Sequence, residues 1–208
     1  MLAGEFCFIN NQYYKDFPDQ NLMRNKEATA GKLHNRPCFF CFSDSINADI
    51  YWLVPASSRY DKYKGIYDKK VQRYGHCKTI VLGELLGKPA AFLIQNMCPI
   101  TPKYISEIYF NKNHIPVRMD YKFTSAIIKN SHDVLRMVLL GNQRIVFPDI
   151  MSIYKGLEQQ LKLEKSIQQE AQSLTARLLT AKNQAEYLNS ERSERMVKIH
   201  REHDEPEK

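Results

Sequence analysis

At residues 50–64 the chain reads IYWLVPASSRYDKYK. A run of apolar and aromatic residues bounded by Asp49 and Pro55 is typical of a buried strand, and we predict a strand over residues 50–54 that ends at the proline. Small hydroxyl side chains and then cationic side chains follow directly. The stretch therefore predicts one element of a sheet and a polar site at the end of that element.

Similar short runs occur throughout the first part of the chain. Further strands are expected over residues 5–9, 38–42, 79–82 and 90–94, a short helix or turn over residues 11–17, and a helix over residues 131–140. Apolar residues recur at helical spacing in the last of these segments, and Gly141 is a suitable helix stop. Short strands with a few helices predict an α+β domain with a mostly antiparallel, curled sheet.

The composition changes after Pro148. From residue 151 to about residue 201 there is no proline, and apolar residues follow the 4-3 spacing of a long helix with heptad character. We therefore predict a domain over residues 1–150 and a helical tail over residues 151–208 with a frayed, charged end. The first half of the tail is expected to pack on its own domain, and the later half to meet a second copy or stay mobile. The residues expected to become buried are Leu157, Ile167, Leu174, Leu178 and Leu188.

The overall charge favours a polyanionic partner. The chain has 208 residues, a formal charge of +7 and a pI of about 9.1. Lysine and arginine release condensed counterions when they bind phosphate backbones, although charge that merely keeps the protein soluble is the alternative. The sequence shows neither a long apolar run nor a secretory signal, and its five cysteines are odd in number and lie mostly in apolar stretches. These features predict reduced thiols in a cytoplasmic protein.

The polar residues after the first strand form the main candidate site. The hydroxyls of Ser57 and Ser58 can hydrogen-bond a phosphate oxygen. The cations that follow can neutralise it, and the interleaved tyrosines offer rings for stacking bases. The alternative interpretation is that the two serines cap a helix whose polar face carries the cations. The two interpretations are compatible, because a helix N-terminus itself attracts anions.

A second candidate segment, HNRPCF at residues 34–39, lies just before another expected strand. A loop at this position can present both His34 and Arg36 to a ligand. Histidine exchanges protons near neutral pH, and arginine can grip a phosphate with two donors. The alternative is an ordinary exposed polar loop.

Metal binding is the competing chemistry. Cys38 and Cys41 form a CxxC pair that His76 and Cys77 could complete as a zinc set. A zinc CxxC normally lies in a tight turn, whereas these cysteines flank aromatic residues, and strand alternation places them on opposite faces. No acidic cluster suited to Mg²⁺ accompanies the two serines. We therefore expect neither a metal nor another cofactor.

These segments together resemble a family. HNRP at residues 34–37, LVPASSR at residues 53–59 and then Lys62 resemble the type III toxin–antitoxin endoribonucleases (the ToxN, AbiQ and CptN group), which carry a Pro-x-[Ser/Thr]-Ser motif followed by a basic residue. FCFINNQY at residues 6–13 resembles the family's first strand, which runs into a tyrosine near the active site. Residues 120–123, the helix over 135–140 and residues 144–148 resemble the later part of the toxin. The similarity covers residues 5–150 and looks closest to the CptN branch.

The resemblance implies a compact, strongly bent sheet surrounded by helices, and a sequence-selective endoribonuclease. The RNA's own 2′-hydroxyl attacks, without a metal, and leaves a 2′,3′-cyclic phosphate and a 5′-hydroxyl. The implied partners are cellular RNA and a pseudoknot-like antitoxin RNA made of repeats, which inhibits the toxin in a protein–RNA assembly. The implied biological role is plasmid maintenance or phage defence. The residues assigned to catalysis are Ser57, Ser58, His34 and Lys62. The residues assigned to RNA binding are Tyr13, Arg36, Arg59, Tyr60, Lys64, Tyr121 and Lys122.

The chain departs from the family pattern at two places. The better-known branch has a lysine two positions after the second motif hydroxyl, where this chain has Tyr60, so Arg59 and Lys62 are the neighbouring candidates for the catalytic cation. The helical tail after about Lys155 also extends beyond the core toxin. Two other classes of protein remain open, a basic RNA-binding protein without catalysis and a scaffolding protein that acts through its C-terminal helix. Toxicity on expression distinguishes the endoribonuclease from both.

Overall fold

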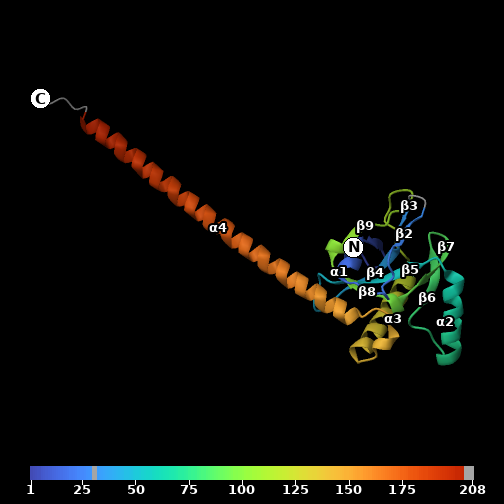
Figure 1. Ribbon diagram of the computed structural model, residues 1–208. Helices are drawn as coiled ribbons and strands as arrows, with labels where there is room; N and C mark the ends of the chain where they lie inside the picture. The colour runs from blue at the N-terminus through green and yellow to red at the C-terminus, as the bar shows by residue number, and fades with distance from the viewer. Residues whose placement is uncertain (30–31, 204–208) are drawn as a thin grey trace. The chain divides into compact units, whose positions relative to one another are not determined.

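The computed structural model describes the backbone of residues 1–29 and 32–203, and the side chains of residues 1–25, 35–192 and 195. The chain divides into two compact units, Met1–Leu157 and Glu158–Lys208. The first unit contains strands and helices, and the described residues of the second, up to His203, belong to one long helix (Figure 1). The expected α+β class is therefore confirmed. The first unit also includes the first turns of the helical segment that the sequence predicts from residue 151.

The first unit is built on a seven-stranded sheet in which neighbouring strands pair antiparallel. Its strands are β1 (Phe6–Ile9), β4 (Pro37–Ser43), β5 (Tyr51–Ser57), β6 (Val81–Leu85), β7 (Lys88–Phe92), β8 (Cys98–Ile100) and β9 (Ile105–Ile108). They are hydrogen-bonded in the order β6-β7-β5-β4-β1-β9, and β8 also pairs with β5. A separate two-stranded sheet consists of β2 (Lys26–Thr29) and β3 (Lys32–His34).

The helices are α1 (Asn11–Asp16), α2 (Tyr60–Tyr74), α3 (Tyr121–Leu139) and α4 (Ile150–His203), with short 3-10 helices η1 (Ile94–Asn96), η2 (Pro102–Tyr104) and η3 (Gln143–Ile145). Side-chain caps explain two of the starts, because Asn10 accepts a hydrogen bond from the backbone of Tyr13 and Asp120 accepts one from that of Phe123. The Asp120 cap starts α3 ten residues before the helix predicted from residue 131. Gly141, the predicted helix stop, has a positive φ of 96°.

Strand β5 is longer than the sequence predicts. The prediction that it ends at Pro55 is wrong, because the strand continues to Ser57 by pairing with β7. Proline removes one backbone donor but keeps its carbonyl, and the Pro55 oxygen accepts a hydrogen bond from the Leu93 amide at 3.0 Å. Ser57 is therefore the last residue of the strand, and Ser58 follows it in a bend before α2.

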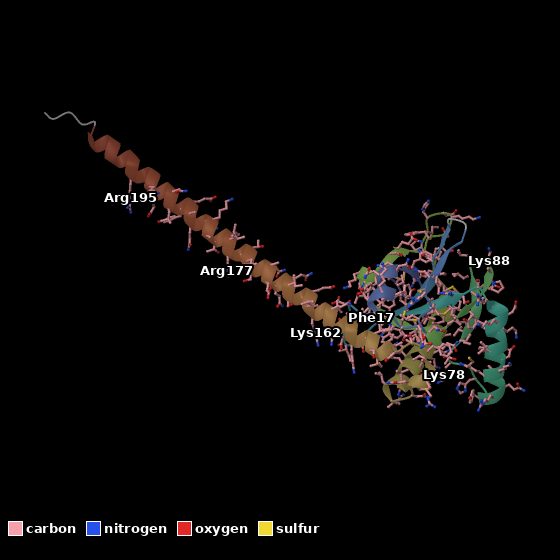
Figure 2. The ribbon with its side chains drawn as sticks, viewed as in Figure 1. Phe17, Lys78, Lys88, Lys162, Arg177 and Arg195 are labelled. Carbon is pink, nitrogen blue, oxygen red and sulfur yellow. The ribbon has the colours of Figure 1, made fainter. Side chains whose placement is uncertain are left out.

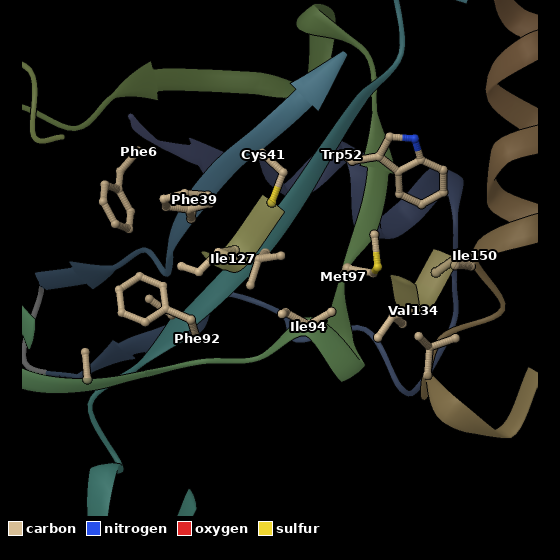
Figure 3. Close-up of a cluster of buried hydrophobic side chains, with 14 of the residues drawn as sticks. Phe6, Phe39, Cys41, Trp52, Phe92, Ile94, Met97, Ile127, Val134 and Ile150 are labelled. Atoms are coloured by element: carbon tan, nitrogen blue, oxygen red, sulfur yellow. The ribbon is translucent and has the colours of Figure 1, made fainter. Parts of the chain in front are cut away.

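One face of the sheet packs against α3. Figure 3 shows the rings of Phe6, Phe39 and Phe92 close together, and their centroids lie 5.6 to 6.1 Å apart. Ile127 and Val134 from α3 are fully buried in the same cluster. Burial of such large apolar side chains contributes roughly 1.5–3 kcal/mol each, so this layer is the main source of stability for the first unit.

The opposite face of the β6–β7 hairpin packs against α2, which lies beside it in Figure 1. Along β7, Ala90 and Phe92 join the cluster on α3, whereas Ala91 joins a smaller cluster. That smaller cluster also holds Ile80 and Leu93, and the α2 residues packed on it are Tyr63, Ile66 and Tyr67. This alternation places α2 next to the hairpin, directly after the end of β5.

Hydrogen bonds to Asp44 connect the first turns of α4 to the sheet. Its carboxylate accepts hydrogen bonds from Trp52 Nε1 at 3.1 Å and from the Tyr154 hydroxyl at 2.9 Å, and the two rings stack. Although partial burial acts in the opposite direction, these hydrogen bonds hold the pKa of Asp44 below its usual value.

Leu157 is fully buried, as expected. The later residues of the predicted stripe are each more than half exposed in the single chain: Ile167, Leu174, Leu178 and Leu188. Over the residues described, the structure has no helix with the length and apolar character needed to cross a membrane.

Candidate active site at the end of strand β5

A cavity of about 400 Å³ lies at the end of β5. Its lining residues are Asn35, Arg36, Pro37, Ala56, Ser57, Ser58, Leu85, Leu86, Lys88, Pro89, Ala90 and Tyr109. The two candidate segments of the sequence therefore meet here, because antiparallel pairing places the start of β4 beside the end of β5. The lining carries cations and hydroxyls but no carboxylate, so it suits an anionic ligand.

Arg36 is held in the cavity wall by its neighbours. Its Nη1 donates to the carbonyl oxygen of Ala56 at 3.1 Å, and its backbone amide donates to Asn25 Oδ1 at 3.1 Å. Asn25 in turn donates to the carbonyl oxygen of Ile9 at 2.8 Å, which ties this turn to the end of β1. Arg36 Nε is buried and has no hydrogen-bond partner within the described part of the chain. A buried donor without a partner is costly, so this nitrogen is suited to a ligand oxygen.

The two serines differ in their surroundings. Ser57 is buried, and its Oγ accepts a hydrogen bond from the Arg59 amide at 3.3 Å, which leaves its hydroxyl hydrogen available to donate. Ser58 is exposed and lines the cavity. Neither serine caps α2, because Arg59 occupies the N-cap position and the first backbone amides within the helix donate to no capping side chain. The capping interpretation is therefore wrong. The first backbone amides of α2 still place the partial positive charge of the helix N-terminus close to the motif.

The structure separates the cations of the motif from the cavity. Arg59, Lys62 and Lys64 are exposed and do not line it, and Lys64 is paired with Asp68 at 2.6 Å. The lysine that does line the cavity is Lys88, the first residue of β7. Figure 2 shows Lys88 at the β6–β7 hairpin.

Sequence reasoning missed Lys88, although a local signal for the hairpin existed. The turn before it consists of Leu86 and Gly87, with φ values of 51° and 73°. Positive φ at both central residues is the hairpin geometry that a glycine in the second position favours. The segment over residues 83–87 is visible in the sequence as a break between strands, but nothing local places it beside the two serines.

Tyr109 and Asn35 are further lining residues that the sequence did not single out. The Tyr109 amide donates to the carbonyl oxygen of Phe6 at 2.8 Å, and its ring packs against Phe8 with centroids 5.0 Å apart. The pairing of β1 with β9 therefore brings this ring to the cavity. A tyrosine beside hydroxyls and cations can stack on a base or donate a hydrogen bond.

Tyr13 requires a correction. It was expected to bind RNA, but it is fully buried and its hydroxyl donates to the carbonyl oxygen of Pro99 at 2.8 Å. Its ring packs against Tyr14, Phe17 and Tyr104, so it belongs to the core and not to the surface.

The remaining assigned residues lie outside the cavity lining. Tyr60 begins α2 and is half-buried. Tyr121 and Lys122 begin α3 and are exposed. His34 is the last residue of β3, two positions before Arg36, and its side chain lies outside the described residues.

The cysteines occupy the interior. As expected, Cys38 and Cys41 lie on opposite faces: Cys41 Sγ lies 3.6 Å from Ser131 Oγ on α3, whereas Cys38 pairs across strands with Cys7 on the other face. Burial raises the pKa of Cys7, Cys41 and Cys98 to about 12, and it also raises that of Cys38. These thiols remain protonated at neutral pH, which makes them poor metal ligands. No cluster of three potential metal-ligating side chains occurs among the described residues.

No protein-family model matches this chain, and no curated protein matches it either. A solved structure that it resembles is AbiQ, described as a lactococcal anti-phage endoribonuclease belonging to the type III toxin–antitoxin system. The two chains are 14% identical, with a TM-score of 0.50, and the match covers 78% of this chain and 98% of AbiQ. At this identity the likeness shows a shared fold, and it extends over nearly all of AbiQ.

Proposed function

We propose that this chain is an endoribonuclease toxin of a type III toxin–antitoxin system. The observation that carries the proposal is the cavity that gathers Arg36, Ser57 and Ser58 from two distant segments of the sequence. The fold shared with AbiQ supports it, as does the basic charge of the chain.

The proposed reaction is attack of the RNA 2′-hydroxyl on the adjacent phosphorus. The bond from phosphorus to the 2′-oxygen forms and the bond to the 5′-oxygen breaks, which leaves a 2′,3′-cyclic phosphate and a 5′-hydroxyl. One group must accept the 2′-proton, and a proton must reach the departing 5′-oxygen. We assign the proton transfer to His34, with Lys62 or a serine as the alternative.

The cavity supplies the electrostatic part of this reaction. The serine hydroxyls and Arg36 Nε can donate hydrogen bonds to the non-bridging oxygens of the five-coordinate phosphorus, and Lys88 adds positive charge. Because these donors and charges come from the protein, the proposed reaction needs neither a metal nor a cofactor.

The basic surface of α2 is the proposed path of the RNA strand beside the cavity. The cations of this helix outnumber its carboxylates, and tyrosines lie among them. We propose that Arg59, Tyr60 and Lys64 bind the strand there, with Tyr121 and Lys122 on α3 making further contacts. A repeat-derived antitoxin RNA, pseudoknot-like in structure, would inhibit the toxin by covering the same surface in a hetero-oligomeric assembly. The toxin would act on selected sequences of cellular RNA in the cytoplasm, as a means of phage defence or plasmid maintenance.

The test is cleavage of a defined RNA by the purified chain in excess chelator. Cleavage should persist, and the upstream fragments should carry cyclic phosphate ends by mass spectrometry. A metal-dependent ribonuclease in the same buffer is the control and should stop. Loss of activity that Mg²⁺ or Zn²⁺ restores would contradict the proposal, as would RNA binding without any cleavage.

The role of His34 has its own test. If His34 transfers the proton, His34→Ala should lower the cleavage rate by roughly 10²–10⁴-fold and flatten the rate–pH profile near neutrality. A profile of unchanged shape would assign His34 to structure and leave proton transfer to Lys62 or a serine.

A further inference from the structure

The second unit presents an apolar stripe along one face of α4. The stripe follows the 4-3 spacing, and over residues 160–185 it consists of Ile167, Ala171, Leu174, Leu178, Ala181 and Ala185, with Leu188 continuing the spacing beyond them. Ile167, Leu174 and Leu178 are 56%, 57% and 71% exposed in the single chain. Apolar surface of this extent on a helix is normally covered by another helix.

We propose that a second copy of this chain covers the stripe, and that residues 160–185 of two chains form an antiparallel two-helix coiled coil. In heptad terms, Ala171 and Leu178 occupy a positions and Ile167 and Leu174 occupy d positions. Antiparallel packing places an a residue of one helix against a d residue of the other. Ala171 then meets Leu174 of the second copy, and Ile167 meets Leu178, so each of these central layers contains a large apolar side chain.

The flanking charges favour this antiparallel arrangement. In the same register Glu170 of each helix faces Arg177 of the other, which gives two symmetry-related attractive pairs. The polar residue Glu164 lies opposite Ala181 and does not meet its own copy. The sequence is therefore complementary to itself in this orientation.

A parallel arrangement places like charges together. In the parallel dimer, Arg177 at a g position of each helix approaches Lys182 at the following e position of the other helix, which gives two symmetry-related repulsive pairs. Glu164 also meets Glu164 of the second copy within the seam. Charge thus distinguishes between the two orientations of the same apolar stripe.

The proposed contact is about 39 Å long at 1.5 Å per residue, and its alanines make the seam thin. Such a pair should be a reversible dimer whose population depends on concentration. The test is sedimentation equilibrium of the purified full chain over a wide range of concentrations, and the expected result is a monomer–dimer equilibrium.

Neighbouring leucines provide a matched pair of variants. Leu178→Glu introduces a charge into the seam and should raise the dimer dissociation constant by at least about 100-fold. Leu179 is similarly exposed but lies about 100° further around the helix, so Leu179→Glu should leave the constant almost unchanged. Both variants change only exposed positions of α4, so the fold of the first unit serves as an internal control by circular dichroism.

Charge reversal tests the orientation. Arg177→Glu should weaken an antiparallel dimer by about tenfold, because it then faces Glu170, and adding Glu170→Arg to the same chain should restore the affinity. In a parallel dimer Arg177→Glu would instead tighten association through Lys182. The proposal is overturned by a chain that stays monomeric at every concentration, by equal effects of the Leu178 and Leu179 variants, or by tightening on Arg177→Glu.

Discussion

The surroundings of the two motif serines predict that their alanine variants separate activity from stability. Ser58 is exposed and has no structural hydrogen bond that its removal would break in the described structure, so Ser58→Ala should change the free energy of unfolding by less than about 0.5 kcal/mol. Ser57→Ala removes the acceptor for the Arg59 amide, a long hydrogen bond of 3.3 Å, and should cost about 0.5–1.5 kcal/mol. Each variant should nevertheless slow RNA cleavage by about 10²–10³-fold, which corresponds to about 3–4 kcal/mol of transition-state stabilisation.

The assay pairs single-turnover cleavage of a short RNA with urea unfolding of the same preparation. Ser45→Ala is the matched control, because Ser45 is exposed and lies outside the cavity lining. The Ser57→Ala/Ser58→Ala double variant should lose less than the sum of the two single effects if both hydroxyls serve one phosphate. A well-folded Ser58→Ala protein with wild-type cleavage would refute the assignment of the serines to the transition state.

Three further predictions follow from other parts of the first unit. Lys88→Ala should reduce the rate of RNA cleavage by about 10²-fold, because Lys88 lines the cavity. Lys62→Ala should mainly weaken RNA binding and make the binding constant less dependent on salt concentration. If Lys88→Ala cleaves RNA normally and Lys62→Ala is inactive, the roles assigned to the two lysines are exchanged. Gly83→Ala should destabilise the fold by about 1–3 kcal/mol in urea, because its Cβ would lie 2.5 Å from the Phe123 ring, whereas Gly65→Ala in the open surface of α2 should stabilise it by up to about 1 kcal/mol. Burial raises the pKa of Cys41 from 9.0 to about 12, so between these values the unfolded chain loses a proton that the folded chain keeps, and rising pH should favour unfolding in urea. Cys41→Ala should remove one proton's share of that dependence, and the buried thiols of Cys7, Cys38 and Cys98 should keep the rest.

Much of the fold was predictable because its signals are local. The strands around residues 5–9 and 38–42 alternate or run apolar over their full length, and the break in composition after Pro148 marks the long helix. Within the seven-stranded sheet, the two strands that the sequence missed depend on distant partners. β9 carries the polar pair Ser106 and Glu107 and gains its strand conformation by pairing with β1, and β8 is three residues long with Pro99 at its centre. Pairing with a neighbouring strand overrides the weak strand propensity of these residues, and such pairing cannot be predicted from the sequence of a short segment alone.

The same distinction applies to the candidate site. Arg36 and the serines lie in motifs that can be recognised within a few residues, and the structure brings them to one cavity. Lys88 and Tyr109 reach it only through the pairing of β7 with β5 and of β9 with β1. Tyr13 was misassigned because an aromatic residue near a strand end looks the same in sequence whether its ring faces a ligand or the core.

The pairing of β5 has a consequence for how the site can be altered. One edge of this strand is hydrogen-bonded to β4, and the other edge is hydrogen-bonded first to β8 and then to β7, so opening it would break ladders on both sides. Its amides should exchange slowly with deuterated water, as part of the most protected group in the first unit. The opposing wall is different, because it ends in the two-residue turn of Leu86 and Gly87. Libraries that aim to change which RNA is cut should therefore vary Leu85, Leu86 and Pro89 around this turn and leave β5 and Lys88 intact.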